Sequence, residues 1–478
     1  MDGEKVFSIN ILAAVVITAF VLVALNLLDP VLSLVAAGAA IAAVILAREP
    51  VYGLLMVIVI APFAGTEILN MQLLGIPGLK LFNLLAAAVL FFFVVYKKPM
   101  PVELRDKQFI YGLILLFTIA VIRSTTFIQK SYNMIWTDEY SVSKFFLSYL
   151  VKPLLVFLPF ILMVYYIRNA KDIRKIINCL VVSVIALSLF ILYLYFFDTP
   201  DKSNFEAVRM GFGAVLGLHG NNLADFYIAT YPLILAYTFA KKNLLLITAL
   251  VLSLVTVGIL YSRSAYAVVI VCTALFFLVS RRAVWIPAIS AAVFMGYSLI
   301  PQSIVQRALT GLDSTNLNDV SAGRTSDIWA PLLNEYLGQP LKMIFGSGRY
   351  GIMSTDAFID GVILRVNHAH SMYLDMIMDS GIIGLAFFLI FFALIFYGFV
   401  KSHPQIKDRN FLHIMYGVEI SMVAFMFRGI SDSFFFPALT NTYLWIVMAI
   451  GLSITYMYKN KDGLQEAQVS NIFSTPNR

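Results

Sequence analysis

The chain has 478 residues, of which 60% are hydrophobic and only 13% are charged. The charged share is about half of that in soluble domains, which excludes a soluble globular protein of this length. The formal net charge of +7 would be compatible with a nucleic-acid partner in a soluble protein, but basic loops on one side of a membrane explain it more simply, and no nucleic-acid partner is expected.

Apolar runs of about 17 to 22 residues, the length that crosses a bilayer core, follow one another along the chain. Backbone groups in lipid must be satisfied within their own segment, so each run predicts a helix. We therefore expect an all-α, polytopic transmembrane helical bundle of about fourteen spans. The expected spans are residues 7–28, 31–47, 51–66, 79–96, 108–123, 146–167, 174–197, 222–240, 243–260, 264–280, 284–300, 381–400, 410–428 and 440–458.

Most basic residues lie in alternate loops, which orients the chain by the positive-inside rule. The pattern predicts cytoplasmic N- and C-termini, with the remaining loops on the opposite face. The basic clusters are Lys97, Lys98, Arg105 and Lys107; Arg168, Lys171, Arg174 and Lys175; Lys241 and Lys242; Arg281 and Arg282; Lys401, Lys407 and Arg409; and Lys459 and Lys461.

Segment 301–380 is the one outer loop large enough for a small subdomain, and a helix is expected within it around 325–337. The expected organisation is N-terminal transmembrane helices in 1–200, helices carrying outer-face arginines in 201–300, the large periplasmic loop in 301–380, C-terminal transmembrane helices in 381–460 and a cytoplasmic tail in 461–478. Cys179 and Cys272 both lie inside apolar runs, so no disulfide framework is expected.

Several arginines lie at the ends of spans or in the long loop on the outer face, where the positive-inside rule predicts few cations: Arg209, Arg263, Arg324, Arg349, Arg365 and Arg428. Guanidinium groups keep their charge in a low dielectric and bind phosphate oxygens through two parallel hydrogen bonds, which suits a lipid-linked pyrophosphate. The alternative is that each arginine pairs with a nearby acid or extends to lipid headgroups. Arg263 is the strongest candidate, because its hairpin Tyr261–Ser264 contains no acid.

A second candidate lies at the end of the long loop, where Asn367-His368-Ala369-His370-Ser371 precedes a new span. Histidine exchanges a proton near neutral pH, so His370 is a candidate base. Gly381 and Gly384 would let the following segment pack closely on a neighbouring helix. Two histidines without a nearby cysteine are a weak metal signal, so we expect no metal site. A purely structural role for His370 stays open.

His370-Ser371, nine residues, Gly381, two residues and Gly384 match the signature His-(Asn/Ser/Gln)-x9-Gly-x2-Gly of the O-antigen ligase and Wzy-type polymerase superfamily. Upstream segments also resemble that family, in the same order, over about residues 200 to 400. They are Arg209-Met210-Gly211 with Gly220-Asn221-Asn222-Leu223-Ala224; Ser262-Arg263-Ser264; and Gly323-Arg324 with Trp329, leading to Phe345-Gly346-Ser347-Gly348.

The resemblance implies a GT-C-type membrane glycosyltransferase of the bacterial inner membrane. Such an enzyme moves a glycan from undecaprenyl diphosphate to an acceptor hydroxyl on the periplasmic face, without metal or other cofactor. By position, Arg209, Arg263 and Arg324 would bind the leaving pyrophosphate, and His370 would be the base or the orienting group. Asn222, Ser371, Gly381 and Gly384 would support them. Asn221 departs from the family, which frequently has proline there, and this puts the role of Asn222 in doubt.

The acceptor distinguishes two members of the superfamily. A polymerase joins one lipid-linked glycan to another and can work with a chain-length regulator protein, whereas a ligase moves the glycan to lipid A-core or a protein. The high number of expected spans favours the polymerase slightly. The alternative of another class is a transporter or flippase for lipid-linked glycans, which would place ionisable residues near the midplane. Glu419 is the clearest charge within a span.

Overall fold

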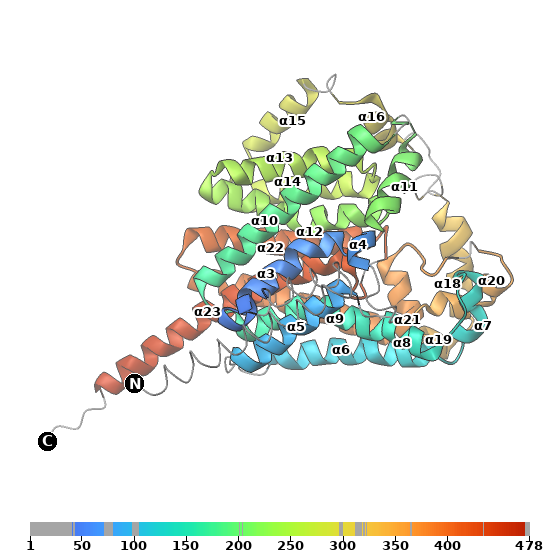
Figure 1. Cartoon of the computed structure of the whole chain (residues 1–478), viewed down its shortest axis with the longest axis horizontal. Coiled ribbons are helices and arrows are strands. Elements are labelled where there is room, and N and C mark those ends of the chain that lie inside the picture. The colour runs from blue at the N-terminus through green and yellow to red at the C-terminus, as the bar shows by residue number, and fades with distance from the viewer. Residues whose placement is uncertain are drawn as a thin grey trace, which may run out of the picture.

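The computed structural model describes residues 41, 44–70, 80–97, 105–199, 201–202, 204–295, 300–310, 318, 321, 323–363, 366–433 and 435–473. Every element that the structure describes in these segments is a helix (Figure 1). The expected all-α class is confirmed. The expected span 7–28 and most of 31–47 lie outside the described residues.

The first half of the described chain contains α3 (Val51–Ile60), η1 (Ala61–Phe63), α4 (Glu67–Asn70), α5 (Leu81–Tyr96), α6 (Arg105–Ser124), α7 (Ile128–Ser131), η3 (Tyr132–Met134), α8 (Val142–Phe146), η4 (Leu147–Val151), α9 (Lys152–Tyr166), α10 (Ala170–Tyr193), η5 (Leu194–Asp198), α11 (Phe205–Leu216) and α12 (Gly220–Lys241). The second half contains α13 (Leu244–Ile259), α14 (Arg263–Val279), α15 (Trp285–Met295), α16 (Gln302–Leu309), η7 (Thr325–Trp329), α18 (Ala330–Leu337), α19 (Pro340–Phe345), η8 (Gly351–Ser354), α20 (Asp356–Ile359), α21 (Met372–Ser402), η9 (His403–Gln405), α22 (Arg409–Arg428), η10 (Leu439–Asn441) and α23 (Thr442–Phe473).

Six helical segments in the described part of the chain are long and apolar enough to cross a membrane, which fits the expected transmembrane protein. A bent pair, Gln108–Ser124 with Ile128–Met134, turns by 66° and raises the number to seven if it counts as one span. The six segments are Val142–Tyr166, Ala170–Asp198, Gly220–Lys241, Met372–Gln405, Arg409–Arg428 and Leu439–Lys459.

The other expected spans are shorter as helices, so the number of fourteen stays a prediction. Val51–Phe63, Leu81–Tyr96, Leu244–Ile259 and Arg263–Val279 are apolar but have only 10–17 residues. α13 and α14 are short because the chain reverses at Tyr261, whose φ of +53° ends one helix before Arg263 begins the next. Such a left-handed residue cannot continue a helix.

The bundle packs around α12, α22 and α23, and the apolar segments Gly220–Lys241 and Leu439–Lys459, which contain α12 and the first part of α23, are mostly buried. Gly417 lets α22 approach α12 closely, since a Cβ there would lie 2.7 Å from Leu233 Cα. Trp445 of α23 is fully buried between Phe157 and Phe392, with ring centroids 4.9 and 6.1 Å away. α11 and α13–α16 lie on one side of this centre and α5, α6 and α9 on the other (Figure 1).

The described parts of segment 301–371 form short helices rather than spans, whereas residues 372–380, expected to belong to the loop, already form the start of α21. α18, α19 and α20 gather with α7 at one end of the molecule, opposite the projecting end of α23 (Figure 1). The helix expected around 325–337 is confirmed as η7 and α18, which run together from Thr325 to Leu337. The periplasmic position of this segment and the division into domains stay predictions.

Candidate functional site

Arg209 lies on α11, which begins at Asn204, where the side-chain oxygen accepts hydrogen bonds from Glu206 N (3.1 Å) and Ala207 N (3.2 Å). The Arg209 side chain is buried and donates to Glu206 Oε2 at 2.8 Å. Its Nε has no hydrogen-bond partner among the described residues. Gly220 packs directly on this side chain, because a Cβ there would lie 2.9 Å from Arg209 Cγ.

Arg263 is the first residue of α14, two residues after the buried turn residue Tyr261. Its guanidinium donates to the carbonyl oxygen of Thr310, just after α16. No acidic residue forms an ion pair with it among the described residues, as the hairpin sequence predicted. A guanidinium that is half-buried and paired only with a carbonyl keeps donors for an anion.

Arg324 comes from the long loop, where it precedes η7 and donates to the carbonyl oxygen of Ser431 at 2.6 Å. Burial lowers the pKa of this guanidinium; the nearby Asp432 opposes the shift, and Arg428, Arg263 and Arg209 add to it. Arginines distant in sequence are therefore close enough for their charges to interact. The structure places Arg209, Arg263 and Arg324 near one another, and their role in binding a pyrophosphate stays a prediction.

Arg307, on α16, joins this cluster, and the sequence analysis missed it. Its Nε donates to the carbonyl oxygen of Tyr261 at 3.2 Å, and its guanidinium lies 4.3 Å from the centroid of the Phe205 ring. Burial and the charges of Arg263 and Arg209 lower its pKa. No motif marks Arg307; the only signal was a further basic residue in the long outer loop.

Arg428 is fully buried and forms several hydrogen bonds within the protein. For this arginine the alternative of pairing with nearby acids therefore holds. Nε donates to Asp225 at 2.9 Å, and one terminal nitrogen donates to Asp432 at 2.8 Å. The remaining bonds go to Ser264 Oγ and to the carbonyl oxygen of Asn221. Arg428 thereby ties the start of α12 and the start of α14 to the end of α22, which holds the arginine cluster in place.

Arg349 is also structural. It donates to Asp379 at 2.8 Å and lies against the rings of Tyr350 and Phe436, 4.1 and 4.7 Å from their centroids. Its own backbone N–H donates to the carbonyl oxygen of Ala120 at 2.7 Å. Arg349 therefore joins the long loop to α6 and α21, and its charge is matched within the protein.

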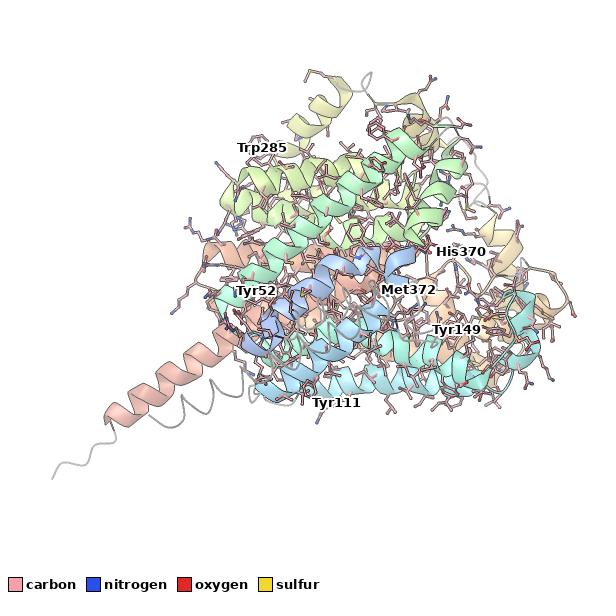
Figure 2. All side chains as sticks on the ribbon, in the orientation of Figure 1. Tyr52, Tyr111, Tyr149, Trp285, His370 and Met372 are labelled. Atoms are coloured by element: carbon pink, nitrogen blue, oxygen red, sulfur yellow. The ribbon has the colours of Figure 1, made fainter. Side chains whose placement is uncertain are left out.

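His370 lies just before α21, in the left-handed region at φ +53°. Its backbone N–H donates to His368 Nδ1 at 3.2 Å, and the two rings meet edge to face at 4.1 Å. The preceding residue is fixed from both sides: Trp329 Nε1 donates to the Ala369 carbonyl, and the Ala369 N–H donates to Asp375, each at 2.7 Å. A positive φ is uncommon for a residue with a side chain, and the two bonds to Ala369 help to hold His370 in it. Figure 2 shows His370 toward the end of the molecule that carries α18.

Burial lowers the pKa of His370 to about 3, and the neighbouring His368 and Arg324 add to the shift while Asp432 opposes it. The pKa of His368 is lowered too, first by burial. Both imidazoles are therefore neutral at pH 7. A neutral ring has one nitrogen able to accept a proton, and among the described residues no hydrogen bond involves a ring nitrogen of His370.

Gly381 breaks α21, with φ 72° and ψ −177° inside the helix. The break frees the carbonyls of Met378 and Asp379, which accept from Ser347 N at 2.7 Å and Gly348 N at 2.9 Å. A Cβ on Gly381 would lie 2.0 Å from the Ile344 carbonyl oxygen. The expected close packing is confirmed at Gly381, where the neighbour is the end of α19.

At Gly384 the expectation is wrong in detail. A Cβ there would lie 2.2 Å from Ser380 Cβ, in the same broken helix, and at an ordinary 3.6 Å from Leu116 of α6. Gly384 therefore accommodates the distorted turn before it rather than a close neighbouring helix.

Two supporting candidates lie beside the cluster. Asn222 is near the start of α12, half-buried, next to the Asn221 carbonyl that accepts from Arg428 at 3.3 Å. Ser371 is buried and precedes α21, where its carbonyl oxygen accepts from Asp375 N at 2.9 Å. Neither side chain has a hydrogen bond to the described residues, so the roles of Asn222 and Ser371 stay predictions.

Within the described segments, no three His, Cys, Asp or Glu side chains are grouped in a way that would hold a metal ion. The chemistry that these residues offer is that of several guanidinium groups beside a neutral imidazole. Such a site binds a strongly anionic group and accepts a proton next to it.

The described residues form a helical protein with six segments long and apolar enough to cross a membrane, and with several arginines near the His368–His370 pair. Residues 248–389 match the O-antigen ligase family. This segment contains Arg263, Arg307, Arg324 and His370, and the match confirms the resemblance to the O-antigen ligase and Wzy superfamily. A domain of this family implies a membrane enzyme of ligase- or polymerase-like function. No curated protein sequence matches the chain.

Proposed function

We propose that the protein is a GT-C-type glycosyltransferase that moves a glycan from undecaprenyl diphosphate to an acceptor hydroxyl. The observation that carries the proposal is that Arg209, Arg263 and Arg324 interact with one another through their charges, and that Arg324 also acts on the neutral imidazole of His370. The residues come from α11, α14 and the long loop, so the convergence is a product of the fold and not of one sequence motif.

The arginines act on the leaving group. In the reaction the acceptor oxygen bonds to the anomeric carbon of the donor sugar while the bond from that carbon to the phosphate oxygen breaks. Negative charge then develops on the diphosphate, where preorganised cations stabilise the transition state most. Arg263 and Arg324 are paired only with backbone carbonyls among the described residues, so their charges are available to this group.

His370 acts on the incoming hydroxyl, whose proton it accepts as the new bond forms. Its low pKa comes from burial first, and then from His368 and Arg324. Binding of a diphosphate introduces opposite charge and raises the pKa of the imidazole toward the range of an effective base. The base is thus matched to its task only when the donor is in place.

The acceptor we favour is a second lipid-linked glycan, which makes the protein an O-antigen or exopolysaccharide polymerase. The chemistry at the donor is the same in a ligase that uses lipid A-core. Purified protein incubated with lipid-linked repeat units alone tests both the activity and the acceptor. Laddered products support the polymerase; transfer that occurs only after lipid A-core is added identifies the ligase, and no transfer to either acceptor argues against the proposal.

The proposed location is the bacterial inner membrane, with both termini cytoplasmic and the site on the periplasmic face. The alternation of basic clusters along the chain supports this orientation. Cysteine substitutions at Lys242 and Ser326, both exposed, test it. Only the cysteine at position 326 should react with a membrane-impermeant maleimide added to spheroplasts.

The transporter alternative depends on charges within spans, and the clearest of these is locally satisfied. Glu419 is buried and lies 2.6 Å from His403 Nε2, at the far end of α21 from His370. A charge that is paired between two neighbouring helices does not by itself mark a path through the membrane. The glycosyltransferase therefore accounts for more of the charged residues.

A further inference from the structure

A second polar site lies in the bundle, apart from the arginine cluster. A cavity of about 210 Å³ opens between the start of α9, the Arg349–Tyr350 segment and the loop that follows α22. Its polar lining consists of Ser148, Tyr149, Lys152, Arg349, Tyr350 and Ser433. The O-antigen ligase match at residues 248–389 does not include Ser148, Tyr149, Lys152 or Ser433. Figure 2 shows Tyr149 and His370 toward the same end of the molecule.

Lys152 supplies the charge of this cavity. It is an exposed residue of the apolar segment Val142–Tyr166, and an ammonium group on such a segment is costly in a membrane unless something matches it. Among the described residues Lys152 has no ion pair or hydrogen bond through its side chain, and the ionisable group that acts on it is another cation, Lys80. Nothing in the described structure therefore balances this charge.

The helix is distorted where it lines the cavity. Leu147–Val151 is π-helical, and Lys152 follows directly. π-helical turns are rare and occur frequently at functional sites, because the wider turn redirects side chains. Here the distorted segment directs Ser148, Tyr149 and Lys152 toward one cavity.

The other walls are fixed before any ligand binds. Tyr149 and Tyr350 meet edge to face at 5.1 Å, and Trp136 packs on Tyr350 at 5.5 Å. Arg349 is held by Asp379 at 2.8 Å, so its charge is already matched. An anion in the cavity would therefore face Lys152, with tyrosine and serine hydroxyls as further donors.

The cavity adjoins the candidate catalytic site through one loop. Ser433 lines the cavity, and its N–H donates to Asp432 at 2.9 Å. The Asp432 carboxylate in turn accepts from Arg428 at 2.8 Å and acts on the pKa of both His368 and His370. The two sites are thus separate but share the residues between α22 and α23.

We propose that this cavity is a second anion site, which holds the phosphate group of the acceptor substrate. The inference rests on the proposed polymerase function, in which both substrates are lipid-linked diphosphates. The arginine cluster binds the diphosphate of the donor, which leaves in the reaction. Lys152 binds the diphosphate of the acceptor, which stays attached to the product. The acceptor is then held by its headgroup while its sugar hydroxyl reaches His370.

The test separates donor from acceptor kinetics. Lys152→Met removes the charge with little change in length, and Lys152→Arg keeps the charge. Lys130→Met, at an exposed position of α7, is the matched control. With lipid-linked polymer as donor and a labelled single repeat unit as acceptor, Lys152→Met should raise the KM for the acceptor by about tenfold or more. The KM for the donor should stay within about threefold of the wild-type value in Lys152→Met. In Lys152→Arg and Lys130→Met, the KM for the donor and the KM for the acceptor should both stay within about threefold of wild type.

An unchanged acceptor KM in Lys152→Met, beside an active wild type, overturns the inference and leaves the proposed function standing. If Lys152→Met raises the KM for the donor instead, the cavity binds the leaving diphosphate, and the inference is overturned as well. If the wild type transfers nothing, titration with inorganic diphosphate decides. The wild type should bind two equivalents, and Lys152→Met and Arg263→Gln one each. Equal stoichiometry in wild type and Lys152→Met contradicts a second anion site.

A competition experiment distinguishes binding of the acceptor from binding of a membrane lipid. Phosphatidylglycerol in mixed micelles should compete poorly with diphosphate at the Lys152 site. Displacement at equal concentration would identify the cavity as a general lipid site and overturn its assignment to the acceptor.

Discussion

Arg324 and Arg263 belong to segments about sixty residues apart in the sequence, yet the charge of Arg263 contributes to lowering the pKa of Arg324, whose own burial is the larger cause. Like charges approach in a protein interior only where the fold holds them there. Arg428 helps to hold the arginine-bearing helices in place, because it links α12, α14 and α22 through its bonds to Asp225, Ser264 and Asp432. The cluster is therefore preorganised for an anion.

Replacing Arg263 with lysine should damage donor use, although the charge is kept. A point charge cannot form the two parallel hydrogen bonds that a guanidinium offers to phosphate oxygens. We expect kcat/KM for the donor to fall by about ten- to a hundredfold. Arg281→Lys, in an exposed turn between α14 and α15, is the control and should behave as wild type. Wild-type turnover in Arg263→Lys would argue against a phosphate role.

The low pKa of His370 predicts an unusual pH profile. Because the folded pKa is about 3, below the ordinary value of about 6.5, the ring of the free enzyme stays neutral as the pH falls through 6.5. The profile of kcat/KM, which reports the free enzyme, should therefore show no acid limb from His370 between about pH 7.5 and 5. An acid limb near 6.5 that disappears in a His370 variant would contradict the neutral-imidazole assignment.

His368 contributes to that shift, so His368→Asn should raise the pKa of His370. The acid limb of kcat/KM should then move upward, toward the ordinary value of histidine. The measurement is the same pH profile, recorded on both proteins at matched donor concentration. An unmoved limb would contradict a contribution of His368 and leave burial and Arg324 as the causes of the low pKa.

Gly381→Ala should destabilise the protein, since the new Cβ would lie 2.0 Å from the Ile344 carbonyl oxygen in a backbone of φ 72°. Positive φ alone costs about 1 to 3 kcal/mol for a residue with a side chain, and the steric contact adds to it. The control is Gly398→Ala in the same helix, where a Cβ meets nothing within 4 Å. Melting in detergent should show a lower Tm for the first variant and an unchanged or higher Tm for the second.

Arg428→Met should be more damaging to stability than any other arginine change. It leaves the carboxylates of Asp225 and Asp432 without the cation that both contact, at a cost of about 3 to 5 kcal/mol. Adding Asp225→Asn should recover part of the Tm, because one of the two uncompensated charges is removed. A double variant less stable than Arg428→Met would contradict this account of Arg428, Asp225 and Asp432.

Much of the site was predictable, because motifs in a fixed order named Arg209, Arg263, Arg324 and His370. The spacing did not indicate Arg307, whose place depends on how α16 packs on the turn at Tyr261. Hydropathy predicted apolar runs where the six long helices lie, but it started the span after the long loop at residue 381, whereas α21 begins at Met372. The reason is the break at Gly381: the polar loop around Ser347 bonds the carbonyls of Met378 and Asp379, so a helical turn exists ahead of the apolar run.

The central claim is that His370 accepts the proton of the attacking hydroxyl in a glycan transfer. The most direct measurement is single-turnover transfer by purified His370→Ala, with labelled undecaprenyl-diphosphate-linked glycan and excess acceptor. The account predicts loss of transfer by about a hundredfold or more, with Tm and donor binding at the arginine cluster unchanged. Transfer at the wild-type rate in a folded, donor-binding variant would contradict it.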